Sequence, residues 1–136
     1  TTRRELQPFQ LRKLFLEWLF SGSPQVSNLE LGLSEGVFTL EPTLSTMLAS
    51  ELTGSGYMRA PLPQNAWTIT PDPLEAASRA GSFKNNGGDR WPSARSWFLV
   101  GTTGREDVLI AWGALAQPRT LSPGDVLEVP LSLSYA

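Results

Sequence analysis

The sequence predicts a mainly β protein, a single antiparallel β-sandwich with an N-terminal amphipathic helix and long loops. Two observations in its last third lead to this prediction. Strand-like apolar runs alternate there with Gly-rich turns, at residues 97–100, 101–104, 108–115, 122–125 and 126–133. Pro123 presets φ to about −65° and Gly124 tolerates a positive φ, so the turn at 122–125 is predicted to be of type II. No residue in this region is an obvious catalytic group.

The N-terminal part carries a helical pattern. Its apolar side chains recur at the spacing of one helical face over residues 9–20, at Leu11, Leu14, Phe15, Trp18 and Leu19. Pro8 suits a first helical turn and Gly22 a C-terminal stop. Residues 1–8 are expected to form an arm that docks on a partner, ahead of a single β-rich domain at 9–136.

The middle of the chain predicts short elements joined by long loops. Alternating leucines indicate a strand with one buried face over 28–33. The long segment 34–53 contains helical spacing around 43–52, and it is expected to be functional or disordered because of its length. Shorter elements follow: strands at 57–60 and 67–70, weak helical propensity at 74–79 and a turn at 84–89.

The closing run at 126–133 places four apolar side chains on one face, at Leu127, Val129, Leu131 and Leu133. Pro130 cannot donate a hydrogen bond to a neighbouring strand, so this run is expected to be an edge strand or a bulged one.

The composition excludes several function classes. The chain has 136 residues, 11 basic and 13 acidic side chains, a formal net charge of −2, no histidine and no cysteine. One domain with its own core is expected at this length. Without His or Cys there is no disulfide, no thiolate metal site and no common general base near neutral pH, so we predict a protein that is not an enzyme and has no cofactor. The near-neutral charge argues against a specific nucleic-acid partner, and the apolar runs are too short for a membrane.

The remaining polar candidates are better explained by ordinary structure. Glu106 and Asp107 are adjacent on an expected loop, where both would face solvent rather than form a glycosidase pair. The turn at 85–89 offers oxygen ligands for Ca²⁺ but lacks the pattern of an EF-hand loop. Trp67 and Trp91 lie beside prolines, where a partly wet interface, or an aromatic platform for sugars, competes with burial.

Several short motifs follow one another along the chain: the segments 11–20 and 29–33, Gly54-Ser55-Gly56-Tyr57-Met58-Arg59, Trp91-Pro92, Gly113-Ala114-Leu115-Ala116-Gln117-Pro118 and Gly124-Asp125. Taken in order, these motifs resemble a family of small bacteriophage virion proteins of decoration or tail-fibre type. The chain departs from that pattern at Trp97, which is followed by Phe98 rather than Gly, and in the length of 34–53. The resemblance implies a non-enzymatic structural subunit that works in many copies.

On this basis the sequence predicts a capsid decoration or cement protein that binds the major capsid protein lattice. It would be located in the virion, assembled in the cytoplasm of a bacterial host, and would form a homo-oligomer. The alternatives are a tail, baseplate or fibre component, with tail proteins as partners, and a carbohydrate-binding module. The candidate interface residues are Arg3, Arg4, Phe9, Met47, Leu48, Trp67 and Trp91.

Overall fold

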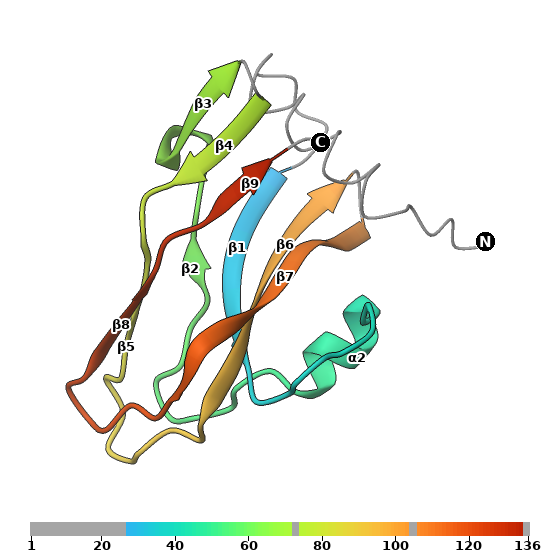
Figure 1. The fold of residues 1–136 in the computed structure, drawn as a ribbon. Helices are drawn as coiled ribbons and strands as arrows, with labels where there is room; N and C mark the ends of the chain where they lie inside the picture. Colours follow the sequence, from blue (N-terminus) through green and yellow to red (C-terminus); the bar gives the residue numbers. More distant parts are fainter. Residues whose placement is uncertain (1–26, 72–73, 104–105, 135–136) are drawn as a thin grey trace.

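The structure is a computed structural model that describes residues 27–71, 74–103 and 106–134. The described chain is mainly β and its strands pair antiparallel, which confirms the predicted class (Figure 1). The following predictions fall outside the described residues: the arm at 1–8, the helix at 9–20, and the candidates Arg3, Arg4 and Phe9.

The largest sheet has four strands in the spatial order β2-β1-β6-β7. Their bounds are Ala60–Pro61 for β2, Ser27–Ser34 for β1, Ala94–Thr103 for β6 and Glu106–Arg119 for β7. β1 is the strand predicted at 28–33. Its three leucines are all buried on one face, as the alternation requires: Leu29, Leu31 and Leu33.

β6 and β7 form a longer hairpin than the sequence predicts. Residues 101–103, expected in the turn, pair with β7: Gly101 lies opposite Val108 and Thr103 opposite Glu106. The two threonines are β-branched and fit a pleated strand, so one glycine does not end it. The expected loop position of Glu106 and Asp107 is therefore wrong, because both residues begin β7.

Five shorter strands lie across the core from this sheet (Figure 1). They are β3 (Trp67–Pro71), β4 (Leu74–Ser78), β5 (Gly81–Lys84), β8 (Val126–Val129) and β9 (Ser132–Ser134). β4 pairs with β3 and β9, and β5 pairs with β8. Pro130 separates β8 from β9, as its missing N–H predicts. The backbone of Ser78 bridges this break by donating to the Leu131 carbonyl at 2.9 Å.

The main core fills the space between the large sheet and the shorter strands. It contains aliphatic and aromatic side chains from both sides, among them Leu31, Leu33, Leu62, Phe83, Trp91, Leu99, Leu121, Val129, Leu131 and Leu133. The inward face predicted for 126–133 is therefore confirmed. Burial of this apolar surface is the dominant favourable term in folding, so the two sides stabilise each other.

The outer face of the large sheet is covered by residues 35–52. This segment contains α2 (Leu44–Ala49), whose N-cap Thr43 accepts a hydrogen bond from the Thr46 backbone at 3.1 Å. Met47 packs from α2 onto Phe98 and Val100 of β6, forming a second apolar cluster. The short helix predicted around 43–52 is confirmed, and its packing gives the long segment an ordered role as a cover.

Two predicted elements are wrong and one strand was not predicted. Residues 74–79 have helical propensity, yet β4 forms there because pairing on both edges outweighs a weak local preference. The strand expected at 57–60 is reduced to its last residue, which begins β2. A 3-10 turn, η1 (Gln64–Ala66), then leads into β3, which confirms the strand expected at 67–70. β5 carries too few apolar residues to be recognised in the sequence.

The turn between β7 and β8 has the predicted geometry. The Asp125 backbone N–H donates to the Ser122 carbonyl at 2.9 Å, and Gly124 has φ +91°. Pro123 and Gly124 therefore occupy the two central positions of a type II turn, where only glycine takes a positive φ without strain.

Candidate functional site

Two of the motifs singled out in the sequence, the segment 54–59 and Trp91-Pro92, meet around the buried Trp91 ring. Gly54 lies against the face of Trp91, so closely that a Cβ on this glycine would lie 2.3 Å from Trp91 Cδ1. Trp91 Nε1 donates to the Ser55 carbonyl at 2.7 Å, and the Tyr57 ring meets the Trp91 ring edge-on at 5.6 Å. These contacts fix the position of the buried Trp91 ring and hold residues 54–57 against it.

A polar network extends from this junction along the outside of β1. Arg59 donates two hydrogen bonds to the Glu51 carboxylate, from Nε at 2.8 Å and from Nη2 at 2.9 Å. Arg59 also reaches Glu30 Oε1 at 3.3 Å, and its guanidinium lies 5.6 Å from the centre of the Phe98 ring. Bidentate pairs of this kind fix geometry as well as charge.

Tyr57 completes the network. Its hydroxyl donates to Glu51 at 2.7 Å and accepts from the Leu33 backbone N–H at 3.0 Å. Burial raises the pKa of the Tyr57 hydroxyl well above its ordinary value, and the bond to Glu51 acts in the same direction. The bond to Glu51 also raises the pKa of the Arg59 guanidinium. Neither group exchanges a proton near neutral pH, so the network has a structural role rather than an acid–base one.

The turn at 85–89 is tied down by its own first residue. The Asn85 side chain is buried and donates from Nδ2 to the carbonyls of Asp89 at 2.8 Å and Leu121 at 2.9 Å. Its Oδ1 accepts from the Gly87 N–H at 2.9 Å. The three hydrogen bonds of this amide hold the turn together and join it to Leu121. They favour an ordinary turn over a Ca²⁺ site.

The sugar platform expected from two tryptophans is not formed. Trp91 is 1% exposed and Trp67 is 8% exposed, and both belong to the main core. Trp67 Nε1 donates to the Leu62 carbonyl at 3.1 Å. An aromatic platform needs an open ring face, so these two residues do not support a carbohydrate-binding module, and as interface candidates they offer no exposed ring in this structure.

Neither a metal cluster nor a membrane-spanning helix is found in the described part of the chain. Within 27–71, 74–103 and 106–134, no three His, Cys, Asp or Glu side chains are grouped so that they could hold a metal ion. The helices in the same residues are all too short or too polar to cross a bilayer.

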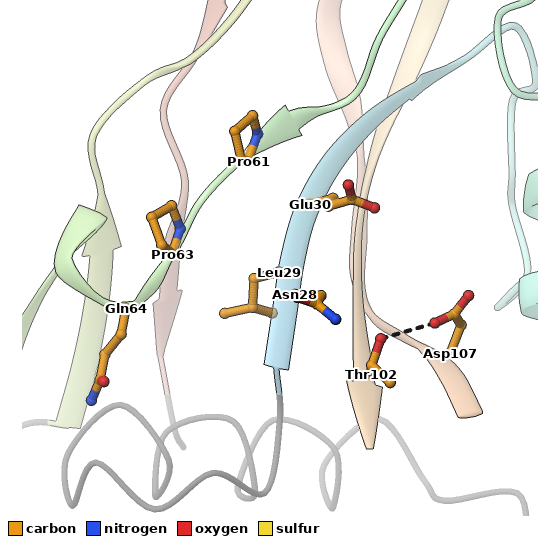
Figure 2. A pocket seen from close by; sticks show the side chains of 8 residues that line it. All are labelled: Asn28, Leu29, Glu30, Pro61, Pro63, Gln64, Thr102 and Asp107. Carbon is orange, nitrogen blue, oxygen red and sulfur yellow. Dashed lines mark hydrogen bonds between the residues drawn. The ribbon is translucent and has the colours of Figure 1, made fainter. Parts of the chain in front are cut away.

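A hollow of about 510 Å³ lies beside the start of β1 (Figure 2). Its lining comes from β1, from β2 and the residues after it, and from the β6–β7 hairpin: Asn28, Leu29, Glu30, Pro61, Pro63, Gln64, Thr102 and Asp107. Its two carboxylates already have partners, since Glu30 accepts from Arg59 and Asp107 accepts from the Thr102 hydroxyl at 2.9 Å. The hollow has no paired acids free for hydrolysis.

Exposed apolar side chains gather instead in the segment that covers the outer face. Val37 is 67% exposed, Leu40 is 83% exposed and Leu48 is 40% exposed. The charged residues of 35–50 are acidic, Glu35 and Glu41, and both lie at the surface. We call residues 35–50 the outer apolar segment. Exposed apolar side chains next to polar ones are typical of surfaces that bind other proteins.

A second hollow, of about 210 Å³, runs along the free edge of β7. Its lining joins the outer apolar segment to β7 and β9: Glu41, Trp97, Leu109, Ile110, Ala111, Trp112, Ser132 and Leu133. The Trp112 ring is half-buried and meets Phe38 of the outer apolar segment edge-on at 6.2 Å. The outer apolar segment and the β7 edge are therefore adjacent parts of one side of the molecule.

A scan of family models and searches of curated proteins and solved structures gave no match to this chain. The function must therefore be inferred from the chain's own residues.

The structure separates the two candidates on α2. Met47 is fully buried in the second apolar cluster and offers no exposed surface in this structure, whereas Leu48 is exposed. Sequence reasoning missed Val37 and Leu40. Both lie in a stretch without helical or strand alternation, and an apolar residue in such a stretch gives no sign of which way it faces.

Proposed function

We propose that this chain is a bacteriophage virion structural protein, specifically a capsid decoration subunit that binds the major capsid protein lattice. The class rests on the motif resemblance of the sequence, and the surface rests on the outer apolar segment. The proposed fold is a β-sandwich whose open end is covered by the N-terminal helix at 9–20.

One observation supports a role in assembly above the others. Val37 and Leu40 are the most exposed aliphatic side chains of the outer apolar segment, whereas Met47 of the same segment is buried. Burying such side chains against a partner is favourable by about 25 cal/mol per Å² of apolar area. The Glu35 N–H donates to the Ser50 carbonyl at 2.9 Å, and the Ser96 hydroxyl of β6 donates to the Gly36 carbonyl at 2.6 Å. These bonds hold the segment in place, and an ordered segment loses less entropy on binding.

The test is co-sedimentation with capsids stripped of the protein. A V37E/L40E variant should fold normally, because both side chains are exposed, and should bind capsids at least about tenfold more weakly, because it buries charge in the contact. V126E is the matched control, since Val126 is 53% exposed on β8, outside the outer apolar segment.

Equal binding by wild type and V37E/L40E would remove the outer apolar segment from the contact. Failure of the wild type to bind capsids, with binding to isolated tails, would replace the decoration role by the tail, baseplate or fibre alternative. Absence of binding to either particle part would overturn the virion proposal.

A further inference from the structure

β7 has a second edge that the described strands leave unpaired. It lies at the end of the order β2-β1-β6-β7, and among residues 27–71, 74–103 and 106–134 it pairs with β6 alone. β7 has 14 residues, and it carries no charge from 108 to 117. Natural sheets usually protect an exposed edge by shortness, charge, proline or a bulge, because free N–H and C=O groups attract another strand. β7 has an extra residue at Ile110 and a proline at 118, but the stretch 111–114 between them pairs regularly with β6 and has an uncharged edge that fits a second strand.

The charges at the two ends of β7 are of opposite sign. Glu106 and Asp107 begin the strand and outnumber the neighbouring Arg105, whereas Arg119 ends it. Glu106, Asp107 and Arg119 are all exposed. A second copy of β7 in antiparallel orientation would place acid against base at both ends, and a parallel copy would place like charges together. The strand is therefore complementary to itself in the antiparallel sense.

Two irregularities in β7 limit the register of such a pair. Leu99 pairs with Ala111 and Val100 with Leu109, so Ile110 is an extra residue, and residues 115–118 do not follow β6 one by one, since Ser96 pairs with Ala114 and Ala94 with Arg119. The side-chain alternation is inverted on passing Ile110. A two-fold axis at Gly113 sets Ala111 opposite Leu115 of the second copy, and both residues pack toward the main core.

Beyond the bulge this register continues with matching faces. Leu109, which packs on the outer cluster, meets the exposed Ala116 of the second copy. Glu106 then lies at the same end of the pair as Arg119 of the second copy. The side-chain faces and the end charges therefore favour the same antiparallel orientation.

We propose that two copies of this chain join edge to edge through antiparallel β7 strands, with the two-fold axis at Gly113, so that the four-stranded sheet continues across the pair. The hollow along Leu109–Trp112 would close against the second copy. This inference deepens the proposed function, because it identifies the contact between copies of the proposed virion subunit.

The test is sedimentation equilibrium of the purified full chain and of charge-reversal variants. E106K and R119E should each weaken the dimer by about tenfold, because each exchanges two attractive pairs for two repulsive ones. An equimolar mixture of the two variants should dimerise as tightly as the wild type. In the mixed dimer the introduced lysine lies at the same end as the introduced glutamate, and the native Arg119 of one copy lies at the same end as the native Glu106 of the other. E128K is the control, because Glu128 is exposed on β8 and should have no effect.

A covalent trap gives a second measurement. The chain has no cysteine, so E106C and R119C introduce the sole thiols. Mixed under oxidation, the two variants should form a disulfide-linked heterodimer faster than either forms a homodimer, because the antiparallel orientation brings these two positions to the same end of the pair.

A monomeric wild type over the whole accessible concentration range would overturn the dimer, as would a dimer that neither charge reversal weakens or a trap without preference for the mixture. Failure of the dimer is distinguishable from failure of the proposed function: a monomer that still binds capsids overturns the former alone, and a dimer that binds no phage particle overturns the latter alone.

Discussion

At the scale of single residues, Tyr57 contributes more to the stability of the fold than its half-buried position indicates. Its hydroxyl supplies the acceptor for the Leu33 N–H, in a strand otherwise paired through its backbone, and also a donor to Glu51. A buried donor without an acceptor costs more than the bond contributes when formed, so removal of this hydroxyl affects β1 directly.

Tyr57→Phe should lower the free energy of unfolding by about 1–3 kcal/mol at neutral pH, because the Leu33 N–H loses its acceptor. Chemical denaturation measures this. Equal stability of variant and wild type would show that water replaces the hydroxyl at no cost.

The same substitution should change the alkaline pH dependence. Because the pKa of Tyr57 is raised in the folded state, the proton is held more tightly there than in the unfolded chain. This group contributes stability that is present below its ordinary pKa of about 10 and lost as the pH rises above that value. Wild-type stability should therefore fall more steeply than that of Y57F above about pH 10, and parallel curves would contradict the assignment.

The tryptophans show why parts of the candidate site could not be read from the sequence. Trp67 and Trp91 stand beside prolines in loop-like surroundings, and that pattern does not reveal that each indole N–H has a carbonyl acceptor inside the protein. Buried tryptophan is favourable when such an acceptor is found, and the acceptor of Trp91 lies 36 residues away.

At the scale of elements, the sequence predicts best where one pattern is repeated. The alternation in β1 and in 126–133 and the helical spacing in α2 each appear several times within one element. β4 could not be predicted, because it forms by pairing with β3 and β9, and its own residues carry no alternating pattern that indicates this pairing. Short elements with weak propensity take the structure that their neighbours offer.

α2 allows a matched pair of substitutions. Met47→Ala should lower the free energy of unfolding by about 2–5 kcal/mol, because it leaves a cavity between α2 and β6. Leu48→Ala, on the exposed side, should stay within about 0.5–1 kcal/mol of the wild type. Denaturant midpoints give both values, and a similar loss for the two would mean that α2 does not pack as described.

At the scale of the whole molecule, one junction connects segments from three parts of the chain. The Trp91 backbone donates to the Leu121 carbonyl at 2.9 Å, while its indole holds Ser55 and Tyr57. Asn85 binds the same Leu121 carbonyl from another side. The large sheet and the shorter strands are thus fastened at one end by contacts that neither could make alone.

Trp91→Phe should destabilise the whole chain by about 1–3 kcal/mol, because the Ser55 carbonyl loses its donor. Circular dichroism and tryptophan fluorescence should still report a single, shared transition. Trp112→Phe is the control, since that ring is half-buried at the outer face and should cost less. Separate transitions in W91F would show that the two sides of the core fold independently.

The hydrogen bond from the Gly87 N–H to Asn85 also affects the chemical stability of the chain. Asn86-Gly87 is the chain's sole Asn-Gly step, the dipeptide most prone to spontaneous deamidation. That reaction begins when the backbone nitrogen of the glycine attacks the preceding side-chain carbonyl. Here this nitrogen is held by Asn85 Oδ1 at 2.9 Å. Gly87 is also confined, since an added Cβ would lie 2.2 Å from the Ser55 carbonyl oxygen. Since both contacts restrict Gly87, we expect deamidation of Asn86 to be slower in the folded protein than in the unfolded chain.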